Sequence, residues 1–172
     1  TARYLVVETD ENGLFSTTFT PIINEAGHYT IMAGHPLEIP VTAQDEFDLV
    51  GMKFYPSSGA LTVAPGSPGS RSLDLQNLGE IPLSGLQVTY QNVPANIQLD
   101  LDVPANLSGL QNTTVVLSVS ASDTSVTQAN IIVTIDCNEG CQALYVLALN
   151  VIEATPSLHV TPPYINTEMV RG

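Results

Sequence analysis

Apolar and polar residues alternate with a period of two along much of the chain, which is the pattern of β-strands that bury one face. The clearest runs span 86–91, 97–103, 114–121 and 130–136. No segment sustains the 3.6-residue apolar period of an amphipathic helix. The sequence therefore predicts an all-β protein.

The segment from Ala143 to Val151 differs from these runs because it is apolar at nearly every position. This composition predicts a strand that is central in its sheet or covered on both sides. Clusters of Gly, Pro and Asn separate the strands with turn signals. Between Met52 and Ala154 we expect about seven or eight strands, the number and spacing of an immunoglobulin-like antiparallel β-sandwich.

The first fifty residues carry a second set of candidate strands, at Tyr4–Glu8, Leu14–Thr20, His28–Ala33 and Glu46–Val50. Turn residues at 10–13 and 24–27 predict hairpins within this set. Four strands are too few for an independent sandwich. We therefore expect residues 1–50 to be a partial Ig-like module whose first strands are missing or come from another chain.

Residues 51–154 are expected to form the complete Ig-like sandwich. Residues 155–172 are expected to be a proline-stiffened linker or the first strand of a following module. Both junctions place apolar or aromatic residues next to proline, which suggests tandem modules with short, stiff joints. The start of the chain lacks the basic-then-apolar pattern of a signal peptide, so we expect a mature, processed or excised sequence.

Two stretches resemble known modules. Residues 9–16, Thr-Asp-Glu-Asn-Gly-Leu-Phe-Ser, together with Glu25-Ala-Gly-His-Tyr29, resemble hairpins of Ig-like modules in large secreted and surface proteins. Residues 73–86, with Asn77, Gly79 and Pro82-Leu83, are similar to the strand-turn-strand of NEW3- and CARDB-type extracellular sandwich modules. The resemblance covers nearly the whole chain, and its motifs are structural. It implies a fragment of a tandem-module extracellular stalk, adhesin or matrix component, with no catalytic residues to carry over.

The charge balance excludes several function classes. The chain has 17 acidic and 4 basic residues, a net charge of -13, and only 12% charged residues against 44% hydrophobic ones. Such acidity repels phosphate backbones and anionic lipid headgroups, which excludes nucleic acid and membrane surfaces as partners. The longest nearly apolar run, 143–152, is about half the roughly 20 residues of a transmembrane helix, so we expect no membrane insertion.

The two cysteines, Cys137 and Cys141, are separated by Asn-Glu-Gly and flanked by predicted strands. A three-residue hairpin turn would place them opposite each other, which favours a disulfide. A redox pair or a metal site is the alternative, but the spacing is not Cys-x-x-Cys and no second cysteine pair is present. A disulfide would indicate an oxidising compartment, and we expect an extracellular or cell-surface location.

No cofactor is indicated by the sequence, and calcium is the ion that its oxygen-bearing residues would favour. One candidate group is Asp45, Glu46 and Asp48; the other is Asp10, Glu11 and Asn12. Neither group matches an EF-hand loop, and plain surface acidity is the alternative for both. A zinc site at His28 and His35 is a further alternative to two solvent-exposed turn histidines.

Two glycosylation sequons begin at Asn106 and Asn112 and are expected to lie in one polar loop. If the source does not glycosylate, both are ordinary turn residues. Lys53 and Asn150 could form an isopeptide bond of the kind found in bacterial surface modules. Such a bond needs a buried carboxylate beside the pair, and the sequence does not indicate one.

Enzymatic chemistry is not indicated. The chain contains no Gly-x-Ser-x-Gly motif, which disfavours serine hydrolysis. Asp100 and Asp102 share the solvent-exposed face of one predicted strand, whereas the two carboxylates of a glycosidase face each other across a cleft. We therefore expect a non-enzymatic extracellular structural or adhesive module, with neighbouring modules or copies of itself as partners and with filament assembly by strand exchange. The alternative is a carbohydrate- or ligand-binding accessory module, which the 6% aromatic content and the absence of Trp disfavour.

Overall fold

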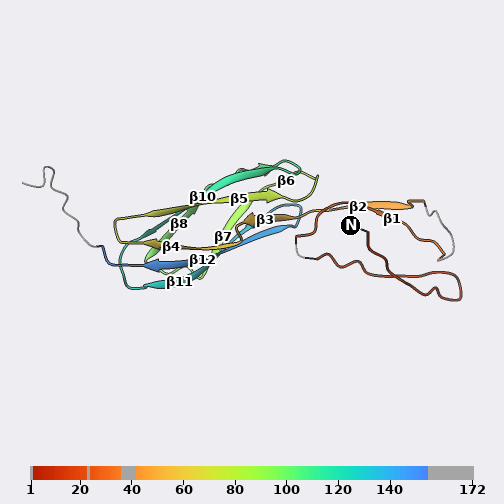
Figure 1. The fold of residues 1–172 in the computed structure, drawn as a ribbon, viewed down its shortest axis with the longest axis horizontal. Helices are drawn as coiled ribbons and strands as arrows, with labels where there is room; N and C mark the ends of the chain where they lie inside the picture. Colours follow the sequence, from red (N-terminus) through yellow and green to blue (C-terminus); the bar gives the residue numbers. More distant parts are fainter. Residues whose placement is uncertain (1, 23, 36–41, 155–172) are drawn as a thin grey trace, which may run out of the picture.

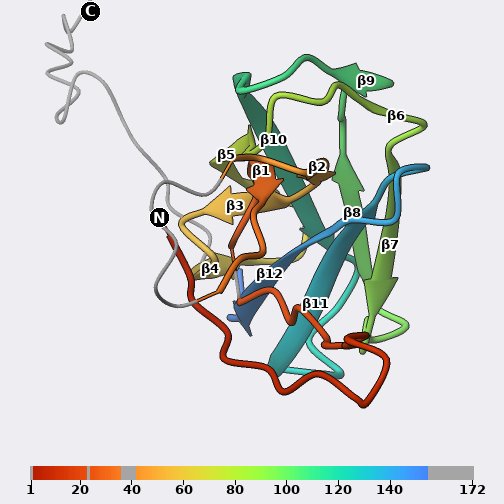
Figure 2. The ribbon, with the colours of Figure 1, turned by 90° about the vertical axis from the view of Figure 1, so that its right-hand side faces the viewer.

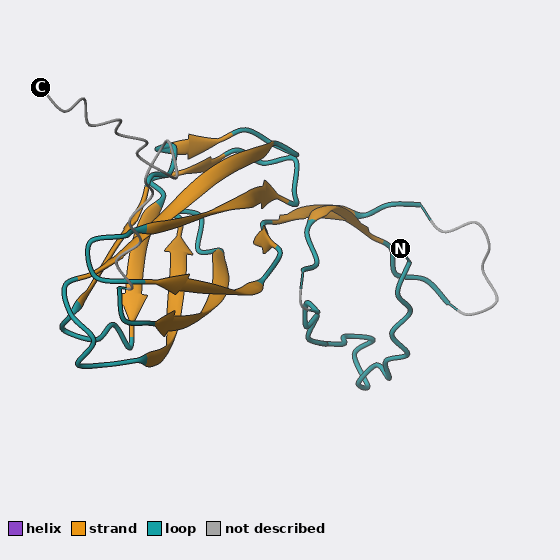
Figure 3. Ribbon diagram, turned by 60° about the vertical axis from the view of Figure 1, so that its left-hand side comes forward, coloured by secondary structure: helices purple, strands orange, loops and turns teal. Residues whose placement is uncertain are grey.

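A computed structural model describes residues 2–22, 24–35 and 42–154 of the protein. Two four-stranded sheets pack face to face between Met52 and Val151, and a smaller two-stranded unit lies beyond one end of this sandwich (Figure 1). Every described strand belongs to a β-sheet and no described residue is helical (Figure 3). The predicted all-β, Ig-like antiparallel sandwich is confirmed.

One sheet, called here the β10 sheet, has the strand order β3-β5-β10-β8. Its strands are β3 (Met52–Tyr55), β5 (Gly69–Asn77), β10 (Asn112–Ala121) and β8 (Ile97–Leu101). The other, the β12 sheet, has the order β4-β12-β11-β7. Its strands are β4 (Ser58–Val63), β12 (Gln142–Val151), β11 (Gln128–Asp136) and β7 (Gln87–Gln91). Two short strands, β6 (Leu83–Ser84) and β9 (Asn106–Leu107), pair at one end of the sandwich.

The chain passes from one sheet to the other between β3 and β4. β3 pairs antiparallel with β5, whereas β4 pairs parallel with β12, from Ser58 opposite Val146 to Val63 opposite Val151. All other strand pairs of the sandwich are antiparallel. The first two strands of the sandwich are therefore both edge strands, β3 in the β10 sheet and β4 in the β12 sheet.

The core lies between the sheets and is built from the inward positions of the alternating strands. Leu117 in the β10 sheet and Ile131, Ile135 and Leu147 in the β12 sheet are fully buried. Tyr145 is also fully buried, and its ring meets Phe54 of β3 edge-on, with the ring centroids 6.0 Å apart. Each such aliphatic side chain contributes about 1.5–3 kcal/mol by leaving water, so this layer accounts for most of the stability of the sandwich.

β12 is central, between β4 and β11, as its composition indicates. Only one of its faces is covered, because Leu144 is 46% exposed and Ala148 is also exposed. Three outward positions of this strand, Leu144, Val146 and Ala148, are apolar although they lie on the uncovered face. This explains why the strand lacks the alternation of its neighbours.

The first fifty residues contain fewer strands than the sequence predicts. β1 (Gly27–Ile31) and β2 (Asp45–Leu49) form an antiparallel pair, but Tyr4–Glu8 and Leu14–Thr20 are not strands. The turn between those two segments does form, since the amide of Asp10 donates to the carbonyl of Leu14 at 2.8 Å. A composition rich in β-branched and aromatic residues does not by itself make a strand, because a strand also needs a neighbour to pair with its backbone.

The segment 155–172, expected to be a linker or the first strand of a following module, lies outside the described residues. Among the residues that are described, no helix could span a bilayer.

Candidate interaction surface

We call the described residues 2–50 the arm. Large apolar side chains of the arm lie on its surface, with 45% to 98% of their area exposed. They are Tyr4, Leu5, Val6, Leu14, Phe15, Ile22, Ile31 and Met32. The rest of the described chain exposes seven similar side chains, but over a much longer stretch of sequence, from Tyr55 to Ile152. Large exposed apolar side chains are therefore most frequent along the sequence in the arm.

An aromatic cluster gives the arm its internal order. The rings of Tyr29 in β1 and Phe47 in β2 stack with centroids 5.3 Å apart. Phe19 packs against both, at 5.7 Å from Tyr29 and 5.4 Å from Phe47. The arginine of the arm, Arg3, lies over the Phe19 ring with its guanidinium carbon 5.1 Å from the centroid, an arrangement that cation–π attraction favours. These contacts fasten the irregular segments 2–22 to the β1–β2 pair.

Glu25 connects the parts of the arm through its carboxylate. Arg3 donates to it at 2.6 Å, the Tyr29 hydroxyl at 2.9 Å and the Ile22 amide at 2.8 Å. The Ile22 amide is the main cause that lowers the pKa of Glu25. The same carboxylate raises the pKa of Tyr29 through their hydrogen bond. Hydrogen bonds to an ionised carboxylate favour its charged form, so Glu25 holds the arm together while it is deprotonated.

The arm meets the sandwich at two glycines. The amide of Leu78 donates to the carbonyl of Gly51 at 2.9 Å. A Cβ added at Gly51 would lie 2.9 Å from the Cβ of Ala26, and one added at Gly79 would lie 3.2 Å from the carbonyl of Leu49. Close backbone approach is thus required where β1 and β2 contact the loop that follows β5.

His28 lies at this junction between acidic side chains. Its Nδ1 is 3.0 Å from Asp48 and its Nε2 is 3.5 Å from Glu46, both on β2. The hydrogen bond with Asp48 is the main cause that raises the pKa of His28, and the nearby charges of Glu46 and Glu80 act in the same direction. Two carboxylates of the first calcium group are therefore engaged with a histidine.

The second calcium group forms a turn. The Asp10 carboxylate accepts the amides of Asn12 at 2.9 Å and of Leu14 at 2.8 Å, and the Leu14 amide is the main cause that lowers the pKa of Asp10. In the part of the chain that the structure describes, no group of three or more His, Cys, Asp or Glu side chains is arranged to hold a metal ion. Bound calcium remains a prediction with no geometry to support it.

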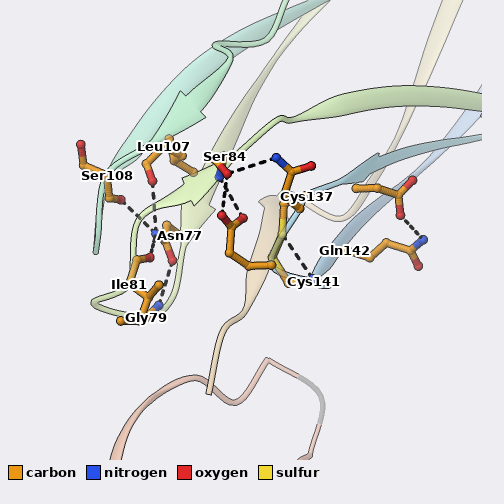
Figure 4. Close-up of a disulfide and its surroundings, with 12 residues drawn as sticks. Asn77, Gly79, Ile81, Ser84, Leu107, Ser108, Cys137, Cys141 and Gln142 are labelled. Carbon is orange, nitrogen blue, oxygen red and sulfur yellow. Dashed lines mark hydrogen bonds between the residues drawn. A yellow bond between two sulfur atoms is a disulfide. The ribbon is translucent and has the colours of Figure 1, made fainter. Parts of the chain in front are cut away.

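The predicted disulfide between Cys137 and Cys141 is present, with Cα atoms 5.6 Å apart at the end of the β11–β12 hairpin (Figure 4). Gly140 has φ +84°, which completes the three-residue turn. Glu139 of this turn accepts hydrogen bonds from the amide of Ser84 at 2.9 Å and from its hydroxyl at 2.6 Å. The hydroxyl is the main cause that lowers the pKa of Glu139. The turn thereby attaches β6 to the β12 sheet, a role that the sequence does not indicate.

Asn77 fixes the same end of the sandwich from the other sheet (Figure 4). Its side chain is buried with the residue 4% exposed, and its amide donates to the carbonyls of Ile81 at 2.8 Å and Ser108 at 3.0 Å. Its side-chain oxygen accepts the amide of Gly79 at 3.0 Å. The sequence identifies this residue only as part of a turn.

The remaining candidate residues lie apart from one another. Asn106 is in β9 and Asn112 is the first residue of β10, and both are exposed, so only residues 108–111 form the loop between them. Asp100 and Asp102 are exposed on and after β8. Lys53 and Asn150 lie on strands of different sheets, with outward-facing positions, and therefore cannot be bonded to each other.

A shallow depression lies on the outer side of β8 and β10. It is lined by Pro68, Gln98, Leu99, Asp100, Ser118, Val119 and Ser120, which include no aromatic residue. A second depression, in the arm, is lined by Arg3, Leu5, Thr18, Phe19 and Thr20. Neither resembles the enclosed, mostly apolar pocket that a small-molecule ligand requires.

No protein-family model matches the sequence, and no curated protein matches it significantly. Among solved structures, the chain is similar to an ASH / PapD-like domain of human CEP192, with 13% identity, a TM-score of 0.46, and coverage of 60% of this chain and 87% of that one. It is also similar to the secreted serine protease VesC of Vibrio cholerae, with 16% identity, a TM-score of 0.40, and coverage of 56% of this chain but only 22% of the protease.

A protein of unknown function from Porphyromonas gingivalis W83 matches with 13% identity and a TM-score of 0.40, over 76% of this chain and 68% of that one. At these identities the similarity concerns the β-sandwich fold alone. The strand order of the two sheets, and not these matches, shows that the chain is a β-sandwich. The finer resemblance to NEW3 and CARDB modules remains a prediction.

Proposed function

We propose that this protein is a non-enzymatic structural or adhesive module of an extracellular protein built from tandem β-modules. In this proposal the sandwich from Met52 to Val151 is the rigid unit. Residues 1–50 are part of a second β-module that is completed by strands from a neighbouring module or from another copy, and 155–172 leads to the next module. The disulfide at Cys137 and Cys141 supports an oxidising location.

The apolar surface of the arm is the observation that carries the proposal. Val6 is 98% exposed, although valine is among the residues that proteins most often bury, and Tyr4 is 91% exposed. Segments 4–8 and 14–20 are rich in the β-branched and aromatic residues that favour strands, but they have no strand to pair with among the described residues. An added strand would satisfy their backbone and cover their apolar side chains at the same time.

Carbohydrate binding is the alternative that the sequence leaves open, and no observation favours it. The depression beside β8 and β10 lacks the aromatic platform on which sugars stack. Binding of the chain to a glycan array would revive this alternative.

The proposal is tested by the association of the arm in the whole chain. Analytical ultracentrifugation and hydrogen exchange are measured over a range of protein concentration. We expect amides of 4–22 to become protected as concentration rises and the Val6→Ser variant to abolish this protection. The matched control is Val116→Ser, which changes an exposed valine of the sandwich, 45% exposed in the structure, and should have no effect.

If the amides of 4–22 exchange at the same rate at all concentrations and the chain stays monomeric, strand completion in trans is wrong. A Val6→Ser variant that unfolds the sandwich would also contradict the proposal, because Val6 has no packing role in the isolated chain.

A further inference from the structure

The sandwich has four edge strands, and three of them carry features that block the addition of another strand. β3 has only four residues, contains Lys53 and is followed directly by Pro56. β8 contains Asp100 and is followed by Asp102 and Pro104. Short strands, charges and prolines are the means by which proteins prevent pairing at sheet edges.

The third protected edge, β4, is capped by a side chain from β5. The guanidinium of Arg71 donates to the carbonyl of Ala60 at 3.1 Å, so this carbonyl is occupied. The guanidinium lies directly against Gly59, where an added Cβ would be 2.6 Å from Nη2 of Arg71. A strand approaching β4 would have to displace this arginine.

β7 is the exception, because its five residues, Gln87 to Gln91, include no charge and no proline. It pairs with β11 on one side only and lies at the margin of the sandwich (Figure 2). Just before the strand begins, the amide of Leu86 donates to the carbonyl of Ala105 at 3.2 Å. Along the outer side of β7 no described residue forms a backbone hydrogen bond with the strand.

The sequence of β7 is symmetric in chemical type about its centre. In an antiparallel pair of two β7 strands centred on Thr89, Gln87 would face Gln91, Val88 would face Tyr90, and Thr89 would face Thr89. Threonine pairs and pairs of an aromatic with a β-branched residue are among the stabilising cross-strand pairs of antiparallel sheets. Such a pair has two-fold symmetry, which is the commonest symmetry of protein dimers.

We propose that β7 is a self-association edge that pairs antiparallel with β7 of a second copy and joins the two β12 sheets into one continuous sheet. The charge distribution permits this pairing. On the strands of the β12 sheet the only charged residue is Asp136, and Gln142 is hydrogen-bonded to it at 2.9 Å. Elsewhere copies with a net charge of -13 repel each other, so this neutral sheet is where they can approach.

The paired edge is short, and small interfaces of this kind give weak complexes. Association should therefore be seen only at high protein concentration, and added salt should strengthen it by screening the repulsion between copies. The edge lies on the sandwich and not on the arm, so it is tested independently of the proposed function.

The test uses the whole chain with Thr89, an exposed residue, replaced by a charged one. Sedimentation equilibrium is measured to about 1 mM protein, where weak interfaces become detectable. Thr89→Lys would place two lysines opposite each other and weaken association by about fivefold or more, as would Thr89→Glu with two carboxylates. An equal mixture of the two variants should associate at least as well as the native chain. Thr62→Lys, which makes the same charge change on exposed β4, should have no such effect.

A cysteine variant tests the register directly, because the chain has no free cysteine. Thr89→Cys should form a covalent dimer under mild oxidation, and Thr62→Cys should not, since only residue 89 meets its own copy across the two-fold axis. The same cross-link should form when Val6→Ser is added, which separates this edge from the arm. Absence of the cross-link, or equal association of Thr89→Lys and the native chain, would overturn the proposal.

Discussion

Replacing Asn77 by alanine tests which contacts hold the disulfide-bearing end of the sandwich. The change removes three hydrogen bonds of 2.8 to 3.0 Å, made with Ile81, Ser108 and Gly79. A net hydrogen bond contributes about 1 kcal/mol, and a buried polar group left without a partner costs about 1–3 kcal/mol. Because the residue is only 4% exposed, water cannot replace these bonds without rearrangement of the loops. We expect Asn77→Ala to lower the free energy of unfolding by about 3–5 kcal/mol.

The assay is urea denaturation followed by circular dichroism, with a thermal melt as a second measurement. For a chain of this size each kcal/mol lowers Tm by about 2–4 °C, so a decrease on the order of 10 °C is expected. Asn130→Ala is the control, since Asn130 is exposed on β11 and should change stability by less than about 0.5 kcal/mol.

A second variant separates the donors of Asn77 from its acceptor. Asn77→Asp keeps the oxygen that accepts from Gly79 but loses the two donors to Ile81 and Ser108, and it directs a carboxylate at both carbonyls. It should be at least as destabilising as Asn77→Ala, and more so at neutral than at acidic pH. If Asn77→Ala stays within about 0.5 kcal/mol of the native chain, or if Asn77→Asp behaves as the native chain, the reasoning from buried donors is refuted.

Three further predictions follow from other contacts. Gly59→Ala should destabilise the sandwich by about 1–3 kcal/mol in urea denaturation, because the added Cβ would lie 2.6 Å from the hydroxyl of buried Tyr145. As a control, Ala60→Ser at an exposed position of the same strand should be neutral. Cys137→Ser should lower stability by about 2 kcal/mol, and a reducing agent should lower the native chain to the same level without affecting the variant. Since His28 has a raised folded pKa, its contribution to the β1–β2 pair is fully present below its ordinary value of 6.5 and is lost as pH rises through the folded pKa. Hydrogen exchange of β1 and β2 should accelerate over that pH range, and a His28→Gln variant should exchange without this pH dependence.

The period-two pattern predicts the strands of the sandwich well because burial of one face is what stabilises them. β8, β10 and β11 lie where their alternation places them, since Leu101, Leu117 and Ile131 all enter the same core. The prediction fails at Tyr4–Glu8, where residues typical of strands follow one another but no neighbouring strand is described. Strand formation depends on a partner that the local sequence does not contain.

The residues that connect the elements are harder to predict than the elements. In the sequence, Asn77 and Glu139 both look like ordinary turn residues. In the structure, Asn77 forms hydrogen bonds to the loops at Ile81 and Ser108, and Glu139 accepts a hydrogen bond from Ser84, 55 positions earlier in the sequence. These roles depend on contacts between distant segments. In contrast, the disulfide was predictable because both cysteines belong to one hairpin, whose turn length fixes the distance between them.

The acidity of the chain determines how its two proposed association surfaces can act. The apolar side chains of the arm would promote aggregation in a neutral protein, but a net charge of -13 weakens the association of separate copies. Arg3 is occupied by Glu25 and Phe19, so the charged groups that the arm presents to a partner are mainly carboxylates such as Glu8 and Glu11. A strand that completes the arm should therefore be apolar and neutral or basic, whereas β7 needs a neutral, self-complementary strand. The two surfaces consequently select different partners, and a single copy could use both at once to extend an assembly in two directions.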